Sequence, residues 1–205
     1  MGAVEIDWLL TFGNNMYFFL LSYAILGAGI KYIDAAYDEK TFSKKIALIL
    51  APVLGILWAY TMVISPVSAT ILLAILLGVF LKGKIDNYAY IIGFSVILVI
   101  ALLAKVELMI LPLVFLATAA VLDELGNDTT DNNTKRLKYK RFRQHLALYF
   151  FGRRYLMKVA LLYLVLLNIF PLYFLLALIF FDETYIIVEL YSQSKTKEVK
   201  KSIKS

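Results

Sequence analysis

Long apolar runs separated by short polar segments form the main pattern along the chain. A helix of about 20 apolar residues crosses about 30 Å of hydrocarbon, and several of the runs approach or exceed that length. The pattern therefore predicts an all-α, polytopic transmembrane helix bundle of about seven spans, formed by one domain over residues 1–193. The predicted spans are 8–30, 46–64, 67–81, 88–104, 108–122 and two within 156–193.

The segment 156–193 has two interpretations. It is either one long helix ending at Asp182, or a hairpin that turns at 168–171, where Asn168 and Pro171 interrupt the apolar run. We prefer the hairpin, because it places the lysine-rich tail, 194–205, on the same side as the other basic segments. The tail itself is predicted to be disordered.

Positive charge predicts the orientation of the chain. Loop 31–45, loop 82–87 and segment 123–155 hold nearly all the lysine and arginine between the spans. Because cytoplasmic loops are enriched in these residues, the three segments are assigned to the cytoplasm and the N-terminus to the outside. Within the last segment, 129–155 mixes basic and apolar residues and is predicted to form an amphipathic stretch at the membrane surface.

Composition supports a membrane location and excludes several kinds of site. Of the 205 residues 61% are hydrophobic, and the mean hydropathy is +0.78. There is no cysteine and only one histidine, His145, so disulfides, thiolate nucleophiles and histidine-rich metal sites are excluded. The net charge of +6 lies in loops and tail, where it indicates contact with lipid headgroups rather than with nucleic acid. We expect an integral protein of the cell membrane with membrane lipids as partners.

Acidic residues gather at the predicted cytoplasmic ends of the spans. Asp34 and Asp38 are four residues apart and therefore share one helix face. Two carboxylates so placed repel each other unless a cation or a proton relieves them. Oxygen ligands without histidine or cysteine suit Mg²⁺. The candidate metal ligands are Asp34, Asp38, Glu124 and Asp128, with Asp123 and Asp86 as possible additions, and the candidate phosphate-binding residues are Lys31, Lys82 and Lys84.

These residues resemble the aspartate-rich motifs of the UbiA-type intramembrane prenyltransferases. In that all-helical family, motifs such as NDxxDxxxD and DxxDxxGD hold Mg²⁺ and the diphosphate of an isoprenoid donor. Asp34 and Asp38 match the DxxxD end of the first motif, and 124–128 (ELGND) resembles the end of the second, with Glu124 and Asp128 as ligands. Lys31 stands where the first motif has its leading aspartate. The resemblance implies a Mg²⁺-dependent transferase acting on an isoprenoid diphosphate at the cytoplasmic face.

Two other functions remain open from the sequence. Acidic residues at one mouth of the bundle could form the vestibule of a cation channel or transporter, and a non-catalytic membrane scaffold would pair the same residues locally with lysines. For a transferase, we expect Tyr32, Tyr37 and Tyr88 to face developing positive charge. Gly27 is interpreted as a site of close helix packing. Donor chain length, acceptor and oligomeric state do not follow from the sequence.

Overall fold

The computed structural model describes residues 15–81, 87–136 and 155–202, and their side chains except at 81, 124, 126–136 and 197–202. These residues form seven α-helices and one π-helical turn, with no strand among them. The all-α fold is therefore confirmed. The elements are α2 (Met16–Asp34), η1 (Ala35–Glu39), α3 (Lys44–Ile64), α4 (Pro66–Leu81), α5 (Tyr88–Leu103), α6 (Ile110–Arg136), α8 (Tyr155–Leu166) and α9 (Leu172–Ser202).

Local sequence signals explain where several helices begin. Asn15 caps α2, its side chain accepting a hydrogen bond from the Tyr17 N–H at 3.0 Å, and Asn87 caps α5 in the same manner. Asparagine at this position satisfies one of the backbone donors that a helix start leaves unpaired. Pro66 is the first residue of α4, a position at which proline's missing N–H costs nothing.

Each predicted span contains a helix, and the hairpin interpretation of 156–193 is confirmed. The chain turns after α8 and re-enters a helix at Leu172, with Asn168 in the left-handed backbone region at φ 56°. Three of the polar segments differ from expectation, because helix continues into each of them. Loop 31–45 is helical as far as Glu39, segment 123–155 as far as Arg136, and the tail as far as Ser202. Extending an existing helix adds one hydrogen bond per residue without a new nucleation cost. The stretch 137–154, which holds most of the predicted amphipathic segment, lies outside the described residues.

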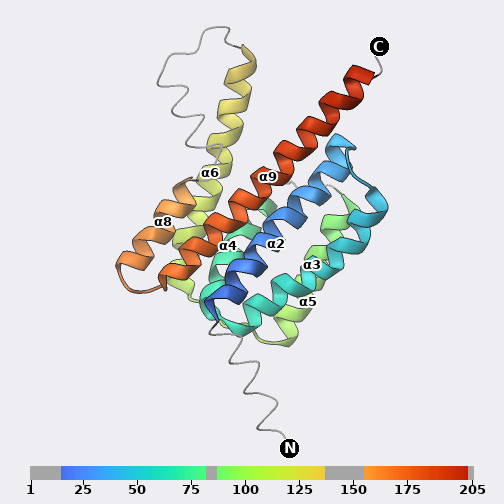
Figure 1. Cartoon of the computed structure of the whole chain (residues 1–205). Helices are drawn as coiled ribbons and strands as arrows, with labels where there is room; N and C mark the ends of the chain where they lie inside the picture. Colours follow the sequence, from blue (N-terminus) through green and yellow to red (C-terminus); the bar gives the residue numbers. More distant parts are fainter. Residues whose placement is uncertain (1–14, 82–86, 137–154, 203–205) are drawn as a thin grey trace, which may run out of the picture.

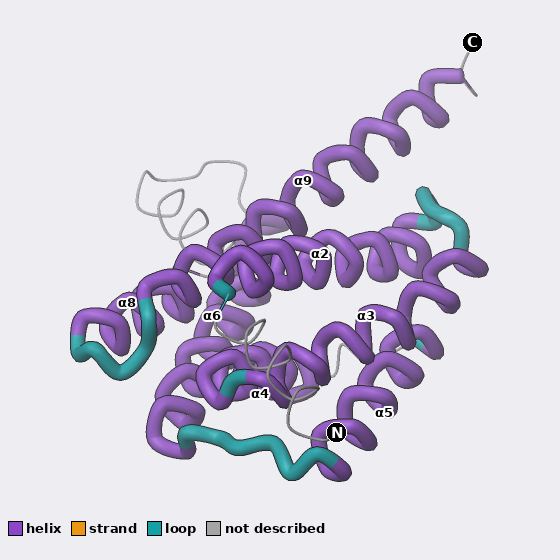
Figure 2. Tube along the Cα trace, turned by 60° about the horizontal axis from the view of Figure 1, so that its bottom comes forward, coloured by secondary structure: helices purple, strands orange, loops and turns teal. Residues whose placement is uncertain are grey.

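The helices form a bundle in which successive members run in alternating directions (Figure 1). The ends of η1, α4 and α6, which adjoin the three basic segments, lie on the upper side in that view. Helix α2 packs against α9 and α3, α3 against α5, and α4 against α6. In both Figure 1 and Figure 2, α2 and α9 lie side by side, and α9 extends past the end of α2.

Aromatic residues and a glycine bring α2 and α9 together. The fully buried rings of Phe19 and Phe174 lie 4.8 Å apart between the two helices. At Gly27 the approach is so close that a Cβ atom would stand 2.0 Å from the carbonyl oxygen of Phe181. The interpretation of Gly27 as a close-packing residue is thus confirmed. The hydroxyl of Thr184 donates to the carbonyl of Ala24 at 2.8 Å across the same contact.

Two helical segments of the described chain are long and apolar enough to cross a membrane, Met16–Glu39 and Lys44–Ile64. The apolar parts of α4, α5, α6 and α8 are shorter. Large apolar side chains point outward from several helices, among them Ile49 on α3 at 69% exposed and Leu103 on α5 at 79%. A soluble protein rarely leaves many such side chains in contact with water.

Candidate functional site

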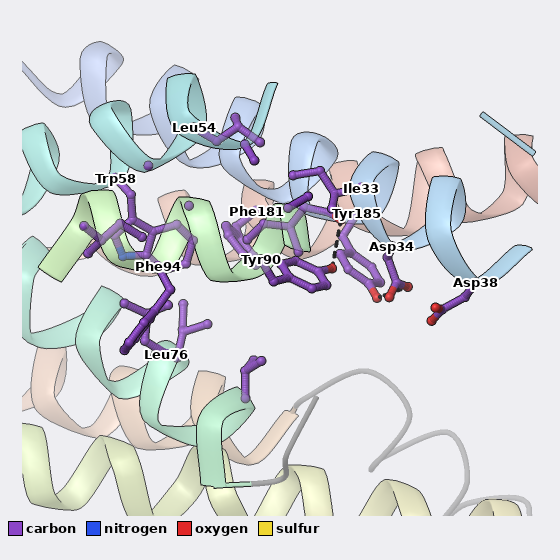
Figure 3. A pocket seen from close by; sticks show the side chains of 18 residues that line it. Ile33, Asp34, Asp38, Leu54, Trp58, Leu76, Tyr90, Phe94, Phe181 and Tyr185 are labelled. Carbon is purple, nitrogen blue, oxygen red and sulfur yellow. Dashed lines mark hydrogen bonds between the residues drawn. The ribbon is translucent and has the colours of Figure 1, made fainter. Parts of the chain in front are cut away.

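The predicted acidic pair lies where α2 passes into a π-helical turn. Asp34 is the last residue of α2, and Asp38 lies in η1, which is followed by Lys40 in the left-handed region with φ 55°. Single π-helical turns within α-helices occur frequently at functional sites. Both carboxylates line the same cavity and stand at one end of it in Figure 3. The prediction that they share one helix face is therefore confirmed.

The cavity lies among α2, α3, α4, α5 and α9 and has a volume of about 300 Å³. This is the lower end of the range of about 300–1,000 Å³ for small-molecule pockets. Apart from the carboxylate end, its walls are mainly aliphatic and aromatic. The side chains labelled along it in Figure 3 include Leu54, Leu76, Phe94 and Phe181, with Trp58 at the end opposite the carboxylates.

Lys31 forms a buried ion cluster behind the acidic pair. Its ammonium nitrogen lies 3.0 Å from Asp34 Oδ2 and 3.0 Å from Glu39 Oε1, and the side chain is only 7% exposed. The same ammonium lies 5.4 Å from the ring centre of Tyr185 on α9. A buried charge is tolerated when it is paired in this way. The ammonium that the sequence suggested for a phosphate is therefore already paired with two carboxylates of its own helix.

Helix α9 holds the other side of this cluster. Ser192 donates to Glu39 Oε2 at 2.5 Å and takes a hydrogen bond of the same length from the Thr41 hydroxyl. The Tyr185 hydroxyl points toward Asp34 Oδ2 at 3.5 Å. These contacts, together with Lys31, tie the π-helical turn to α9. Glu39, Tyr185 and Ser192 were not among the predicted site residues, because nothing local in the sequence indicates that α9 packs beside α2.

Two other aspartates, Asp123 from the predicted set and Asp182, have structural partners in the bundle. Asp123 is 1% exposed. Its carboxylate accepts hydrogen bonds from the backbone N–H groups of Leu156 at 3.1 Å and Met157 at 2.7 Å. It thereby satisfies donors at the start of α8 and complements the positive end of that helix. On α9, Asp182 forms an ion pair of 2.7 Å with Lys158. Both roles support the helix bundle directly.

The remaining predicted ligands cannot be placed at the cavity. Lys82, Lys84 and Asp86 lie outside the described residues, and the backbones of Glu124 and Asp128 belong to α6 while their side chains are among those not described. Among the described side chains, no group of three or more histidine, cysteine, aspartate or glutamate residues has the geometry of a metal site. The described half of the predicted site is thus Asp34 with Asp38, and the second motif stays a prediction.

The aromatic residues of the cavity differ from those expected. Tyr32 stacks on Phe42 with ring centres 4.5 Å apart, Tyr37 lies beneath the Lys44 ammonium, and Tyr88 is 77% exposed. None of the three is among the lining residues, where Tyr90, Phe94 and Trp58 are found instead. Proximity to the acidic motif in sequence was the wrong criterion, because the aromatic side chains of the cavity wall come from α3, α5 and α9.

Comparisons with known proteins leave the chain without an assigned relative. No protein-family model matches it, and neither a curated protein nor a solved structure is similar to it. The resemblance to the UbiA-type prenyltransferases therefore rests on the motif residues alone and stays a prediction.

Proposed function

We propose that this chain is an integral membrane protein that binds an amphiphile, with its apolar chain in the cavity and its polar head at the Asp34–Asp38 end. The membrane location is supported by the two segments of spanning length and by the outward-facing apolar side chains. One observation carries the binding proposal. A pair of carboxylates stands at one end of a cavity whose other walls are apolar, and this distribution matches a molecule with one polar end.

The activity we propose is Mg²⁺-dependent transfer from an isoprenoid diphosphate. Asp34 and Asp38 would hold the metal, because Mg²⁺ commonly takes one or two carboxylates and fills its other positions with water and substrate phosphate. When bound, the metal neutralises the negative charge of the departing diphosphate. The donor set is compatible with that role, although Asp34 also neutralises Lys31 at 3.0 Å.

The chain's own residues would contribute in two further ways. The apolar walls exclude water, so that a carbocation left by cleavage of the C–O bond reacts with the acceptor and not with solvent. The ring faces of Tyr90 and Phe94, both in the cavity wall, would stabilise that positive charge. The Tyr90 hydroxyl is held by donation to the carbonyl of Ile30 at 3.2 Å, which keeps the ring in place.

A cation channel is less favoured by the same geometry. A conducting path needs polar groups along its length, whereas the described cavity is polar mainly at the carboxylate end. A purely structural scaffold agrees with the roles of Asp123 and Asp182 but gives no reason for Asp34 and Asp38 to line a cavity.

The test is binding and turnover of farnesyl and geranylgeranyl diphosphate by the full chain in lipid nanodiscs, with and without Mg²⁺. We expect Asp38→Asn to weaken Mg²⁺-dependent binding at least about tenfold, which corresponds to about 1.4 kcal/mol, and to abolish release of diphosphate. Glu183→Gln is the matched control, because it removes an exposed carboxylate of α9 that does not line the cavity. If binding does not depend on Mg²⁺, or if Asp38→Asn and Glu183→Gln have equal effects, the transferase assignment is refuted. If the chain binds farnesol, which lacks the diphosphate, as tightly as farnesyl diphosphate, the role assigned to the polar head is refuted.

A further inference from the structure

Trp58 carries the one buried side-chain donor or acceptor, among the described residues, that meets no hydrogen-bond partner. The side chain lies on α3, is 2% exposed, and forms part of the cavity wall. Its indole packs edge to face against Phe181 of α9, with ring centres 6.1 Å apart and planes at 83°. The ring is thus held firmly, while its Nε1–H has no acceptor.

A buried N–H without an acceptor is costly, because water has been removed from it and nothing has replaced the water. A single water molecule in the cavity is a poor hydrogen-bond partner for this N–H. Buried waters are retained by about two to four polar partners, and the labelled wall residues near this end of the cavity in Figure 3, Leu54, Leu76 and Phe94, offer no polar side-chain atom. The group that can satisfy the indole is therefore one brought in by an occupant of the cavity.

We infer that the Trp58 Nε1–H is a specificity-determining donor, and that the occupant carries an oxygen acceptor, such as a carbonyl or ether oxygen, in the part that lies against it. The inference rests on the proposed binding of an amphiphile and narrows its class, from isoprenoid diphosphates in general to those whose chain carries an oxygen. A plain hydrocarbon chain would leave the indole N–H without a partner, whereas an oxygenated chain would supply a hydrogen-bond acceptor for it. A site built around a polar group discriminates strongly against a ligand that leaves that group unpaired.

The alternative is that the indole only fills space. Both accounts place a large aromatic residue at 58, and both expect binding to weaken when that residue is made smaller. They differ in whether the cavity binds two ligands of equal shape with different affinity. Only a donor distinguishes a chain that carries an oxygen from one that does not, and only a donor changes its N–H environment when that oxygen arrives.

The experiment compares three probes on the full chain in nanodiscs with Mg²⁺: farnesyl diphosphate and two analogues with a ketone oxygen, one near the middle of the chain and one at its far end. We expect one analogue to bind roughly tenfold more tightly than farnesyl diphosphate, and Trp58→Phe to remove that preference. Phe94→Leu, which alters the same wall without a donor, should weaken all probes and leave the preference in place.

A second readout follows the indole directly. The Trp58 N–H signal, assigned by its loss in Trp58→Phe, should move downfield in ¹H–¹⁵N spectra with the preferred analogue and stay in place with farnesyl diphosphate. Equal affinities for the three probes, or a preference that survives Trp58→Phe, would overturn the inference while leaving amphiphile binding intact. Failure of all three probes to bind would overturn the proposed function, and this inference with it.

Discussion

Replacing Gly27 with alanine should force α2 and α9 apart. The new Cβ would stand 2.0 Å from the Phe181 carbonyl oxygen and 2.8 Å from the Thr184 hydroxyl oxygen. Real Cβ contacts essentially never fall below 3.0 Å, so the helices would have to separate by about 1 Å at this point (3.0 minus 2.0). The obstructing atom belongs to the backbone of α9, and a change of rotamer therefore cannot relieve the contact.

The expected cost follows from two opposing effects. Overpacking in a tightly packed interior costs about 1–3 kcal/mol, and the backbone clash places this site at the upper end. Alanine in place of glycine within a helix adds about 1 kcal/mol of stability, because alanine has the higher helix propensity. We therefore expect Gly27→Ala to lower the free energy of unfolding by about 2 kcal/mol. For a chain of this size that corresponds to a fall in Tm of about 4–8 °C.

Thermal unfolding in detergent, followed by circular dichroism, measures this fall. Gly78→Ala is the matched control, because its nearest obstacle is the Ala120 Cβ at 3.1 Å, so that the helices need to shift by only a few tenths of an ångström. The control should change Tm much less than Gly27→Ala. A Gly27→Ala protein as stable as the wild type, or more stable than the control, would refute the close packing of α2 on α9.

Three further substitutions probe the buried polar contacts by the same measurement. Lys31→Met should destabilise the protein by about 2 kcal/mol, since it leaves two carboxylates without their ammonium; these are 28% and 29% exposed, and water limits the loss. Asp123→Ala should cost about 1–2 kcal/mol by removing both hydrogen bonds to the start of α8, with Asp123→Asn falling in between. Lys158→Met should cost about 3 kcal/mol because it removes the ammonium that neutralises the buried Asp182 carboxylate, and adding Asp182→Leu should recover part of that loss.

The outcomes that would contradict these expectations are distinct. If Lys31→Met were neutral, the cluster that ties the π-helical turn to α9 would contribute nothing to stability. Equal stability of the alanine and asparagine variants at 123 would argue against helix capping by that side chain. If the double variant at 158 and 182 is no more stable than Lys158→Met alone, the cost comes from lost packing rather than from a buried carboxylate that has lost its ammonium.

Much of the helix pattern followed from the sequence because hydrophobic periodicity and helix capping are local. Seven apolar runs predicted seven helices, and the break at 168–171 correctly indicated a hairpin. The spacing of Asp34 and Asp38 placed both on one face for the same reason: a spacing of four residues fixes the direction of a side chain around the helix axis. The ends of the helices were harder to predict from the sequence, since the continuation of a helix into polar residues depends on what those residues contact.

The partners of each charged residue were decided by tertiary structure. Lys31 reads in the sequence as a basic residue beside an acidic motif, available to a phosphate. In the folded chain its ammonium pairs with Asp34 and Glu39 nearby in the sequence and also faces Tyr185. The contact with Tyr185 forms because α9, about 150 residues farther along the chain, packs parallel to α2. The cavity wall likewise joins Trp58 and Phe94 from separate helices. Local spacing determines which side chains share a helix face, whereas only the packing of distant helices determines what that face meets.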